Sequence, residues 1–373
     1  MFNKINTLII VVMVTALLLS ACGTSANASS STPPSSGTLQ VGSIQINGAG
    51  ATFPLPVYTE WIFAYQYVHP SVTLNYQGIG SGGGKKAIID NTVDFAGSDS
   101  VLTADEYTAG KDLQMYPALA GAVVPIYNVD GVTQTLTLDR NTLVGIYNAT
   151  ITKWNDPAIV ALNPGVTLPA ASITAVHRSD GSGTTEIFTN ALSSFSADWK
   201  SNVGAGTSVE WPVDKAGNGI GGKGNQGVAA AVQNTPNSIG YVELSYALAN
   251  KIAFTDIVNK AGNKVTANAD SLVSAMNDFA NTFTDKLTNI IVDGPGAKSW
   301  PIAGYTYLVL HTTSMTDCTK AQKLLGFIKW ALSDPAAAKR AADLGYSVLP
   351  DAVRTQVLAK LGSVTCNGAS VIP

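Results

Sequence analysis

The hydrophobic and polar positions of this chain change between two periods several times along its length. Residues 44–46 and 72–77 alternate apolar with polar positions, which is typical of strands. The stretch between them instead has an apolar face at helical spacing, formed by Tyr58, Trp61, Ile62, Tyr65 and Val68. Strand, turn and helix continue to alternate in this way, and that order predicts an α/β protein with a mainly parallel sheet.

The same periods predict the remaining elements. Apolar runs predict strands over residues 92–100, 115–128, 172–176 and 299–311, and a strand from Ser238 that leads into a helix. Residues 217–232 are expected to be a glycine-rich loop followed by an Ala/Val helix, and a helix through Leu143 and Ile146 has Thr137 or Asp139 as its expected cap. Further helices are expected at residues 85–90, 186–192, 271–283, 320–334, 335–345 and 351–362.

Length and composition describe a packed protein with more than one core. A chain of 373 residues is long for a single core, so two domains are expected. Hydrophobic residues make up 46% and charged residues 13% of the chain, which fits a globular protein and not a disordered one. The formal net charge of −3 provides no broad basic face, so nucleic acid is not an expected partner.

The first 40 residues carry targeting signals. Residues 1–22 combine a charged start at Lys4, a short apolar run and the sequence Leu-Ser-Ala-Cys, which resembles the processing site of bacterial lipoproteins. In that case the chain is cut before Cys22, and Cys22 carries the lipid that holds the protein at the membrane; the alternative is an ordinary signal peptide cut after Ala21. Residues 23–40, rich in Ser, Thr, Pro and Ala, are expected to be a flexible tether.

One glycine-rich turn stands out as a candidate anion site. The sequence HRSDGSGTT (residues 177–185) lies between the strand expected at 172–176 and the helix expected at 186–192. The backbone N–H groups at the start of a helix have no helical acceptor and favour anions. Arg178 adds a permanently charged guanidinium, and Ser182 and Thr184 add hydroxyl donors.

Two further turns have the same character. Thr52 follows the glycines of NGAGATFP, and Ser81 lies in GIGSGGG, each where a strand gives way to a helix. Ligands of α/β sheets bind outside the carboxyl ends of the strands, so the three turns are expected to converge. For a single turn, tight chain reversal by Gly and Ser is an equally good explanation; for three turns together, a small-anion site is the better one.

Two acidic residues beside these turns have to be explained, because a carboxylate repels an anion. Phosphate retains a proton near neutral pH and sulfate does not, so an acceptor in the site would admit phosphate and reject sulfate. We assign this acceptor role to Asp99 and expect Asp180 to pair with Arg178. Helix capping is the structural alternative for both acids.

Other chemistries fit the sequence less well. The pattern G-x-G-x-x-G occurs at both 78–83 and 217–222 of a chain with 35 glycines, so it is weak support for a dinucleotide fold, and no Walker pattern is present. Neither Ser81 nor Ser182 has the glycine register of a hydrolase elbow. Three scattered histidines, expected to be structural, provide no metal-ligand spacing, so neither a metal nor a cofactor is expected.

Two cysteines remain after Cys22. An even pair in a chain exported from the cytoplasm favours a disulfide between Cys318 and Cys366 over two buried free thiols.

Six segments together resemble the phosphate-binding proteins of the bacterial phosphate-specific ABC transporters, the Pst type. They are NGAGATFP, YQGIGSGGGKKAI, TVDFAGSD, HRSDGSGTT, WPV with the following GGKGNQGVAAAV, and SIGYVE, in that family's order and across almost the whole chain that follows the tether. The resemblance implies a type II periplasmic-binding-protein-like α/β fold, with two lobes, a central ligand cleft and a two-strand hinge. The corresponding lobes are residues 41–127 plus 300–373 and residues 128–299, with crossovers near Tyr127–Asn128 and Trp300–Pro301.

The same resemblance implies the function and the site. It implies capture of inorganic phosphate outside the cytoplasm and delivery to the membrane subunits of an ABC permease, without catalysis, by a lipid-anchored monomer. The residues that correspond to the family's phosphate shell are Thr52, Phe53, Ser81, Asp99, Arg178, Asp180, Ser182, Gly183 and Thr184. A phosphate-ester hydrolase and a phosphate-sensing lipoprotein that use the same pocket are the alternatives.

Overall fold

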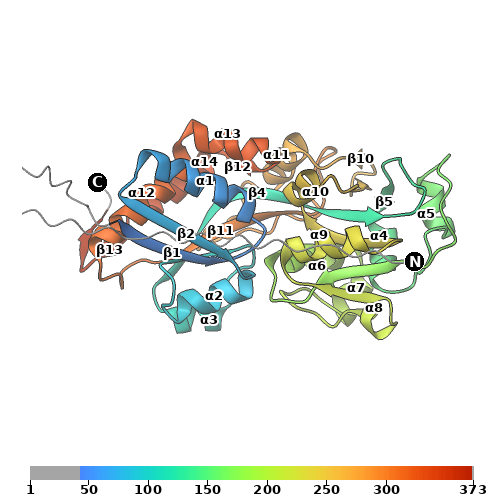
Figure 1. Ribbon diagram of the computed structural model, residues 1–373, viewed down its shortest axis with the longest axis horizontal. Coiled ribbons are helices and arrows are strands. Elements are labelled where there is room, and N and C mark those ends of the chain that lie inside the picture. The colour runs from blue at the N-terminus through green and yellow to red at the C-terminus, as the bar shows by residue number, and fades with distance from the viewer. Residues whose placement is uncertain (1–42, 372–373) are drawn as a thin grey trace, which may run out of the picture. The chain divides into compact units, whose positions relative to one another are not determined.

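The computed structural model describes residues 43–371, in which one long sheet runs through the molecule (Figure 1). Its strands follow the order β2-β1-β3-β11-β4-β8-β6-β7, and β12 adds to β4. Two small sheets, β10-β9-β5 and β13-β14, lie outside it. The strands are β1 (Ile44–Gly50), β2 (Val72–Gly78), β3 (Phe95–Ser98), β4 (Leu113–Asn128), β5 (Thr137–Asp139), β6 (Thr174–Arg178), β7 (Gly219–Gly222), β8 (Ser238–Glu243), β9 (Asp256–Val258), β10 (Lys264–Val265), β11 (Ala303–His311), β12 (Ser347–Val348), β13 (Thr365–Cys366) and β14 (Ala369–Ser370).

The helices lie between these strands in the chain, and all those of eight or more residues are among the ones that the sequence periods predict. They are α1 (Leu55–Val68), α2 (Ser81–Ile89), α3 (Ala104–Gly110), α4 (Arg140–Tyr147), α5 (Pro157–Leu162), α6 (Gly183–Phe195), α7 (Ala197–Asn202), α8 (Pro212–Lys215), α9 (Gly224–Asn234), α10 (Leu244–Asn250), α11 (Ala269–Asp278), α12 (Cys318–Ser333), α13 (Pro335–Asp343) and α14 (Asp351–Leu361). Of the predicted apolar face of α1, Tyr58, Trp61 and Tyr65 are buried and Ile62 is partly buried. Val68 is 59% exposed, so its place on the core face is wrong: it is the last residue of the helix, where the chain turns away. The Trp61 indole also donates to the Ala337 carbonyl oxygen at 2.9 Å.

The main sheet is parallel at both ends and antiparallel in the middle, so the expectation of a mainly parallel sheet is wrong for its centre. β1 pairs in parallel with β2 and β3, and β6 pairs in parallel with β7 and β8. Between these groups, β11 is antiparallel to β3 and β4, and β4 is antiparallel to β8. The antiparallel centre arises because β4 and β11 connect the two parallel groups and run in opposite directions.

β4 is the strand that joins the two parallel groups. Its residues up to Ala122 pair with β11, and those from Val123 onward pair with β8. At this change of partner the Val123 N–H donates to the Ile302 carbonyl oxygen at 2.8 Å, and the Trp300 indole donates to the Val123 carbonyl oxygen at 3.0 Å. The two connections between the groups therefore lie side by side.

Two local predictions differ from the structure. The segment Gly219–Gly222, expected to be a loop, is the edge strand β7, which is recognised through backbone pairing with β6 because glycines leave no side-chain pattern. The helix expected over 271–283 is α11, which ends at Asp278. Its extension is stopped because the Thr282 hydroxyl and the Asn289 amide both donate to the Phe279 carbonyl oxygen, at 2.9 and 2.8 Å.

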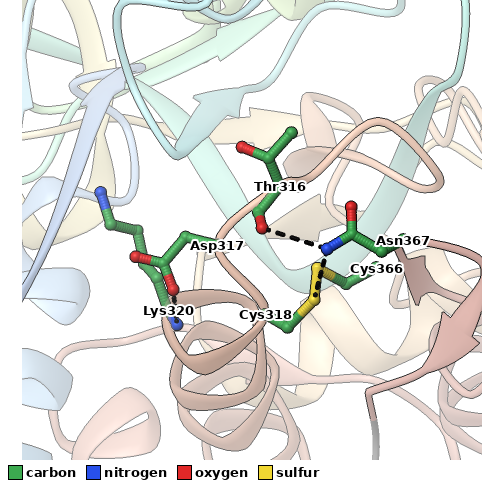
Figure 2. Close-up of a disulfide and its surroundings, with 6 residues drawn as sticks. All are labelled: Thr316, Asp317, Cys318, Lys320, Cys366 and Asn367. Atoms are coloured by element: carbon green, nitrogen blue, oxygen red, sulfur yellow. Dashed lines mark hydrogen bonds between the residues drawn. A yellow bond between two sulfur atoms is a disulfide. The ribbon is translucent and has the colours of Figure 1, made fainter.

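Cys318 and Cys366 form a disulfide that ties the start of α12 to β13 (Figure 2). Their Cα atoms are 5.4 Å apart, and the Asn367 side chain lies over the bond, donating to the Thr316 carbonyl oxygen at 3.4 Å. Cys22, the proposed signal peptide and the tether lie outside the described residues. Within the part of the chain that the structure describes, none of the helices has the length and apolar character that a membrane crossing requires.

Candidate anion-binding site

Arg178, the last residue of β6, is held in a fixed orientation by Asp180. Its Nε donates to Asp180 Oδ1 at 2.7 Å and its Nη2 donates to Oδ2 at 2.6 Å, so the carboxylate grips the guanidinium at two points. Burial alone would raise the pKa of Asp180, but the hydrogen bonds and charge of Arg178 outweigh it and hold that pKa below its ordinary value. The remaining nitrogen, Nη1, lies 3.4 Å from Thr184 Oγ1.

The N-terminus of α6 follows directly. Ser182 caps the helix, since its Oγ accepts from the Thr185 N–H at 3.0 Å. Gly183 and Thr184 are the first two helical residues, whose N–H groups have no acceptor inside the helix. A Cβ atom at position 183 would lie 2.6 Å from both Asp99 Cβ and Ser81 Oγ, so only glycine permits this approach.

The second turn brings Thr52 and Phe53 to the N-terminus of α1. Both residues are buried, and they precede the first helical residue, Leu55, where backbone N–H groups have no helical acceptor. The Thr52 carbonyl oxygen accepts from the Tyr246 hydroxyl at 2.5 Å, and the Phe53 carbonyl oxygen accepts from the Tyr346 hydroxyl at 2.7 Å. Two tyrosines thus fix the backbone of this turn.

The third turn places Ser81 at the first position of α2. Gly80, the residue before it, has a φ of 85°, and a Cβ there would lie 2.4 Å from Asp180 Oδ2. The Ser81 Oγ accepts from the Asp99 N–H at 3.1 Å and from the Gly183 N–H at 3.1 Å. One hydroxyl therefore joins two turns that are 102 residues apart in the sequence.

Asp99 follows β3 and is only 5% exposed. Its Oδ1 accepts from the Thr306 hydroxyl at 2.8 Å, and its Oδ2 lies 3.3 Å from Ser81 Oγ. Burial raises the pKa of Asp99 to about 7, and the Thr306 hydrogen bond and the Arg178 charge only partly offset that effect. A carboxyl with such a pKa is partly protonated near neutral pH.

The structure brings the nine residues predicted from the sequence into one cluster, which also contains a residue that sequence reasoning missed. Asn225, at the start of α9, is fully buried and contacts the hydroxyls of both Thr52 and Thr184 at 3.0 to 3.1 Å. The sequence places Asn225 in GGKGNQG, a glycine-rich loop before a helix like those that contain Thr52, Ser81 and Ser182, and this likeness could have indicated its role. Tyr246 was missed because it acts on the backbone of Thr52 from a helix that carries no polar pattern.

The charged residues around the cluster have partners of their own. Lys85 pairs with Glu106 at 3.0 Å, and the exposed Lys86 pairs with Asp90. His177 contacts Asp214 at 2.8 Å and stacks on Trp211, and His311 contacts Asp112 at 2.6 Å. The described residues include no group of three or more His, Cys, Asp or Glu side chains placed to hold a metal ion.

Comparison with known proteins first defines the class. A family model described as "PBP superfamily domain" matches residues 28–335, which is most of the chain. The phosphate-binding protein PstS of Xylella fastidiosa (strain Temecula1 / ATCC 700964) is 41% identical over 338 residues, covering 90% of each chain. PstS of Methanocaldococcus jannaschii is 34% identical over 335 residues, covering 86% of this chain and 85% of that one. The chain therefore belongs to the PBP superfamily and, within it, to the PstS family.

Solved structures agree on the fold. A phosphate-binding protein from Stenotrophomonas maltophilia superposes with a TM-score of 0.67 at 22% identity, covering 89% of this chain and all of that one. A high-affinity periplasmic phosphate-binding protein, PfluDING, solved with bound phosphate, gives a TM-score of 0.68 at 23% identity and covers 85% and 93%. These likenesses identify the expected two-lobe, periplasmic-binding-protein-like α/β fold.

Proposed function

We propose that this protein captures inorganic phosphate outside the cytoplasm and delivers it to the membrane subunits of an ABC permease. The observation that carries the proposal is the contact of Ser81 Oγ with both the Gly183 N–H and Asp99, beside the Arg178 guanidinium. Helix N-termini, hydroxyls and one guanidinium supply donors for a tetrahedral oxyanion. The relatives named PstS support the same ligand.

Asp99 provides the specificity in this proposal. A dianionic phosphate keeps one proton, which the Asp99 carboxylate accepts, whereas sulfate would face an unpaired charge. The Asp99 pKa of about 7 means that this discrimination acts above that pH, where the carboxyl is ionised, and weakens below it, where the protonated carboxyl can donate to sulfate. Phe53, Ser182 and Thr184 would contribute donors, Gly183 would lie in the same shell with its N–H held by Ser81 Oγ at 3.1 Å, and Asp180 would hold the Arg178 fork.

Release of phosphate requires the two halves of the site to separate. We assign residues 41–127 plus 300–373 to one lobe and residues 128–299 to the other, with the hinge where β4 and the segment before β11 lie side by side. The protein would act as a monomer without catalysis, anchored through a lipid on Cys22. The native chain should then take up radiolabelled fatty acid and a Cys22→Ala variant should not; a native chain that takes up no label would exclude this anchor.

A titration of the purified domain tests the ligand. Calorimetry with phosphate, sulfate and a chromogenic phosphate ester should give tight binding of phosphate alone, and no release of phosphate from the ester. Equal binding of sulfate would contradict the proposed role of Asp99. Turnover of the ester would replace the transport function with a hydrolase.

A further inference from the structure

Asn225 connects two hydroxyls that come from different sides of the site. Its backbone N–H donates to Thr52 Oγ1 at 3.1 Å, and its side-chain Nδ2 donates to the same oxygen at 3.0 Å and to Thr184 Oγ1 at 3.1 Å. All three side chains are almost completely buried. No other residue of the described chain contacts both hydroxyls in the same way.

The orientation of the Asn225 amide is fixed by a third contact. The Glu243 N–H, at the end of β8, donates to Asn225 Oδ1 at 2.9 Å. An N–H group can only face an amide oxygen favourably, so Nδ2 has to face the two threonines. The Glu243 contact uses the backbone, and β8 is held in the sheet by β4, so this orientation belongs to the fold.

The donors that reach the threonines determine where the hydroxyl protons point. A hydroxyl has two acceptor lone pairs and one proton. Thr52 Oγ1 accepts twice from Asn225, and Thr184 Oγ1 accepts from Asn225 Nδ2 and, at 3.4 Å, from Arg178 Nη1. With both lone pairs of each oxygen in use, each hydroxyl is left with its proton to donate.

We propose that Asn225 is a positioning residue that turns the hydroxyl protons of Thr52 and Thr184 toward the bound anion. The inference rests on the proposed phosphate function and deepens it. A hydroxyl can donate or accept a hydrogen bond, and the contacts of Asn225 explain why those of Thr52 and Thr184 act only as donors to the ligand. The oxygens of a bound anion accept hydrogen bonds. They would then meet hydroxyl donors from Thr52 and Thr184 that require no reorientation on binding.

The orientation, and not the volume of the amide, is the property to be tested. In Asn225→Asp an oxygen replaces Nδ2 with little change of shape, and it accepts from the threonine hydroxyls and draws their protons away from the ligand. We expect phosphate affinity to fall about 100-fold, since two hydrogen bonds to a charged ligand are lost. Asn225→Ala leaves the hydroxyls free to rotate and should cost about tenfold, although it removes more packing.

A double-mutant cycle separates this effect from added negative charge. Thr52→Val should weaken phosphate binding about tenfold or more in the native chain and less than twofold in the Asn225→Asp background, where the hydroxyl no longer faces the ligand. If the Asp variant does not fold, the same cycle with Asn225→Ala should show a coupling of the same sign and smaller size. Equal costs of Thr52→Val in both backgrounds would overturn the inference.

Asn163→Asp is the matched control. Asn163 is also buried, with Nδ2 donating to the carbonyl oxygens of Thr137 and Ile159 and Oδ1 accepting from the Thr137 N–H, but it lies outside the site. This variant should lose stability and keep its phosphate affinity. A native protein that does not bind phosphate would contradict the proposed function. Phosphate binding by the native protein together with equal costs of Thr52→Val in both backgrounds would contradict only the role of Asn225.

Discussion

The segment 178–184 and the segment 81–99 build the same kind of corner, where a strand ends beside a helix N-terminus, yet they place opposite charges in it. Arg178 is paired at two points with Asp180, and the pKa of that acid is held low. Among the described residues, the donors within hydrogen-bond distance of the Asp99 carboxyl are the neutral hydroxyls of Thr306 and Ser81, and burial raises its pKa. Both corners place a strand end beside a helix N-terminus. The buried side chain, Arg178 in one and Asp99 in the other, determines which part of a ligand each corner can bind.

A chain with a net charge of −3 can be suited to a dianion through these two corners. Attraction over long distances is not available, so recognition has to come from groups within hydrogen-bond distance. One corner supplies a cation that is already oriented, and the other supplies an acid that still exchanges its proton.

Removal of the cation should have the largest effect. Arg178→Ala removes the guanidinium and leaves Asp180 unpaired beside the anion, so phosphate affinity should fall roughly 1,000-fold or more. Calorimetry measures this loss, and Arg140→Ala, which breaks the Arg140–Asp293 ion pair of 2.7 Å, is the control that should keep its affinity. Near-native binding by Arg178→Ala would mean that the helix N-termini alone hold the anion.

The two acids should affect stability with opposite signs as the pH changes. The folded-state pKa of Asp99, about 7, lies above its ordinary value of 3.8, so the folded protein keeps a proton that the unfolded chain releases between these values. The contribution of Asp99 to the free energy of unfolding therefore falls as the pH rises through this window. The free energy of unfolding of ligand-free Asp99→Asn, relative to that of the native chain, should therefore rise by about a few kcal/mol as the pH increases from about 4 to 7.

Urea unfolding at several pH values provides the measurement. Asp180, with its pKa below the ordinary value, contributes stability that is present near neutral pH and lost as the solution becomes more acidic, so Asp180→Asn should be the less stable variant at pH 7. A difference between Asp99→Asn and the native chain that stays constant with pH would show that Asp99 does not titrate in this range.

Much of the fold and of the site could be predicted from the sequence, because their signals are local. Period-two and period-3.6 patterns located β1, α1 and β2, and glycine-rich turns between such elements marked the corners that contain Thr52, Ser81 and Ser182. The edge strand β7 and the antiparallel centre of the sheet could not be found in this way. Both depend on which backbones pair across the chain, and glycines or uniformly apolar strands leave that choice open.

The part of the site that was missed acts through other residues. Asn225, Tyr246 and Tyr346 contact Thr52, Thr184 or the backbone of Phe53 from elements more than 40 residues away in the sequence. No spacing rule connects such residues, because their neighbours are set by the packing of α9, α10 and the segment before β12 on the three corners. Asn and Tyr in those elements are equally consistent with ordinary packing.

Asp99→Asn should also weaken the discrimination against sulfate. The Thr306 hydroxyl would hold the amide oxygen, because it donates to Oδ1 in the native site, and the new Nδ2 would face Ser81 and the ligand. Above about pH 8, where Asp99 of the native chain is ionised, sulfate then meets a donor instead of an unpaired charge, so the ratio of phosphate to sulfate affinity should fall about 100-fold. Competition of sulfate with phosphate in calorimetry measures the ratio, and Thr306→Val controls for loss of the supporting hydrogen bond. An unchanged ratio would mean that the hydrogen-bond donors of the site, and not Asp99, discriminate phosphate from sulfate.

Asp180→Asn should have the smallest effect on binding because two consequences oppose each other. The amide loses one of the two hydrogen bonds that the carboxylate accepts from the Arg178 guanidinium. It also weakens the hydrogen bond from the Gly224 N–H, which is 3.0 Å from Oδ1 in the native chain. It also removes a negative charge close to the bound dianion. We expect phosphate affinity to change by less than tenfold, measured by calorimetry at two salt concentrations. A loss as large as that of Arg178→Ala would mean that the alignment of the guanidinium, and not its charge, is what this corner contributes.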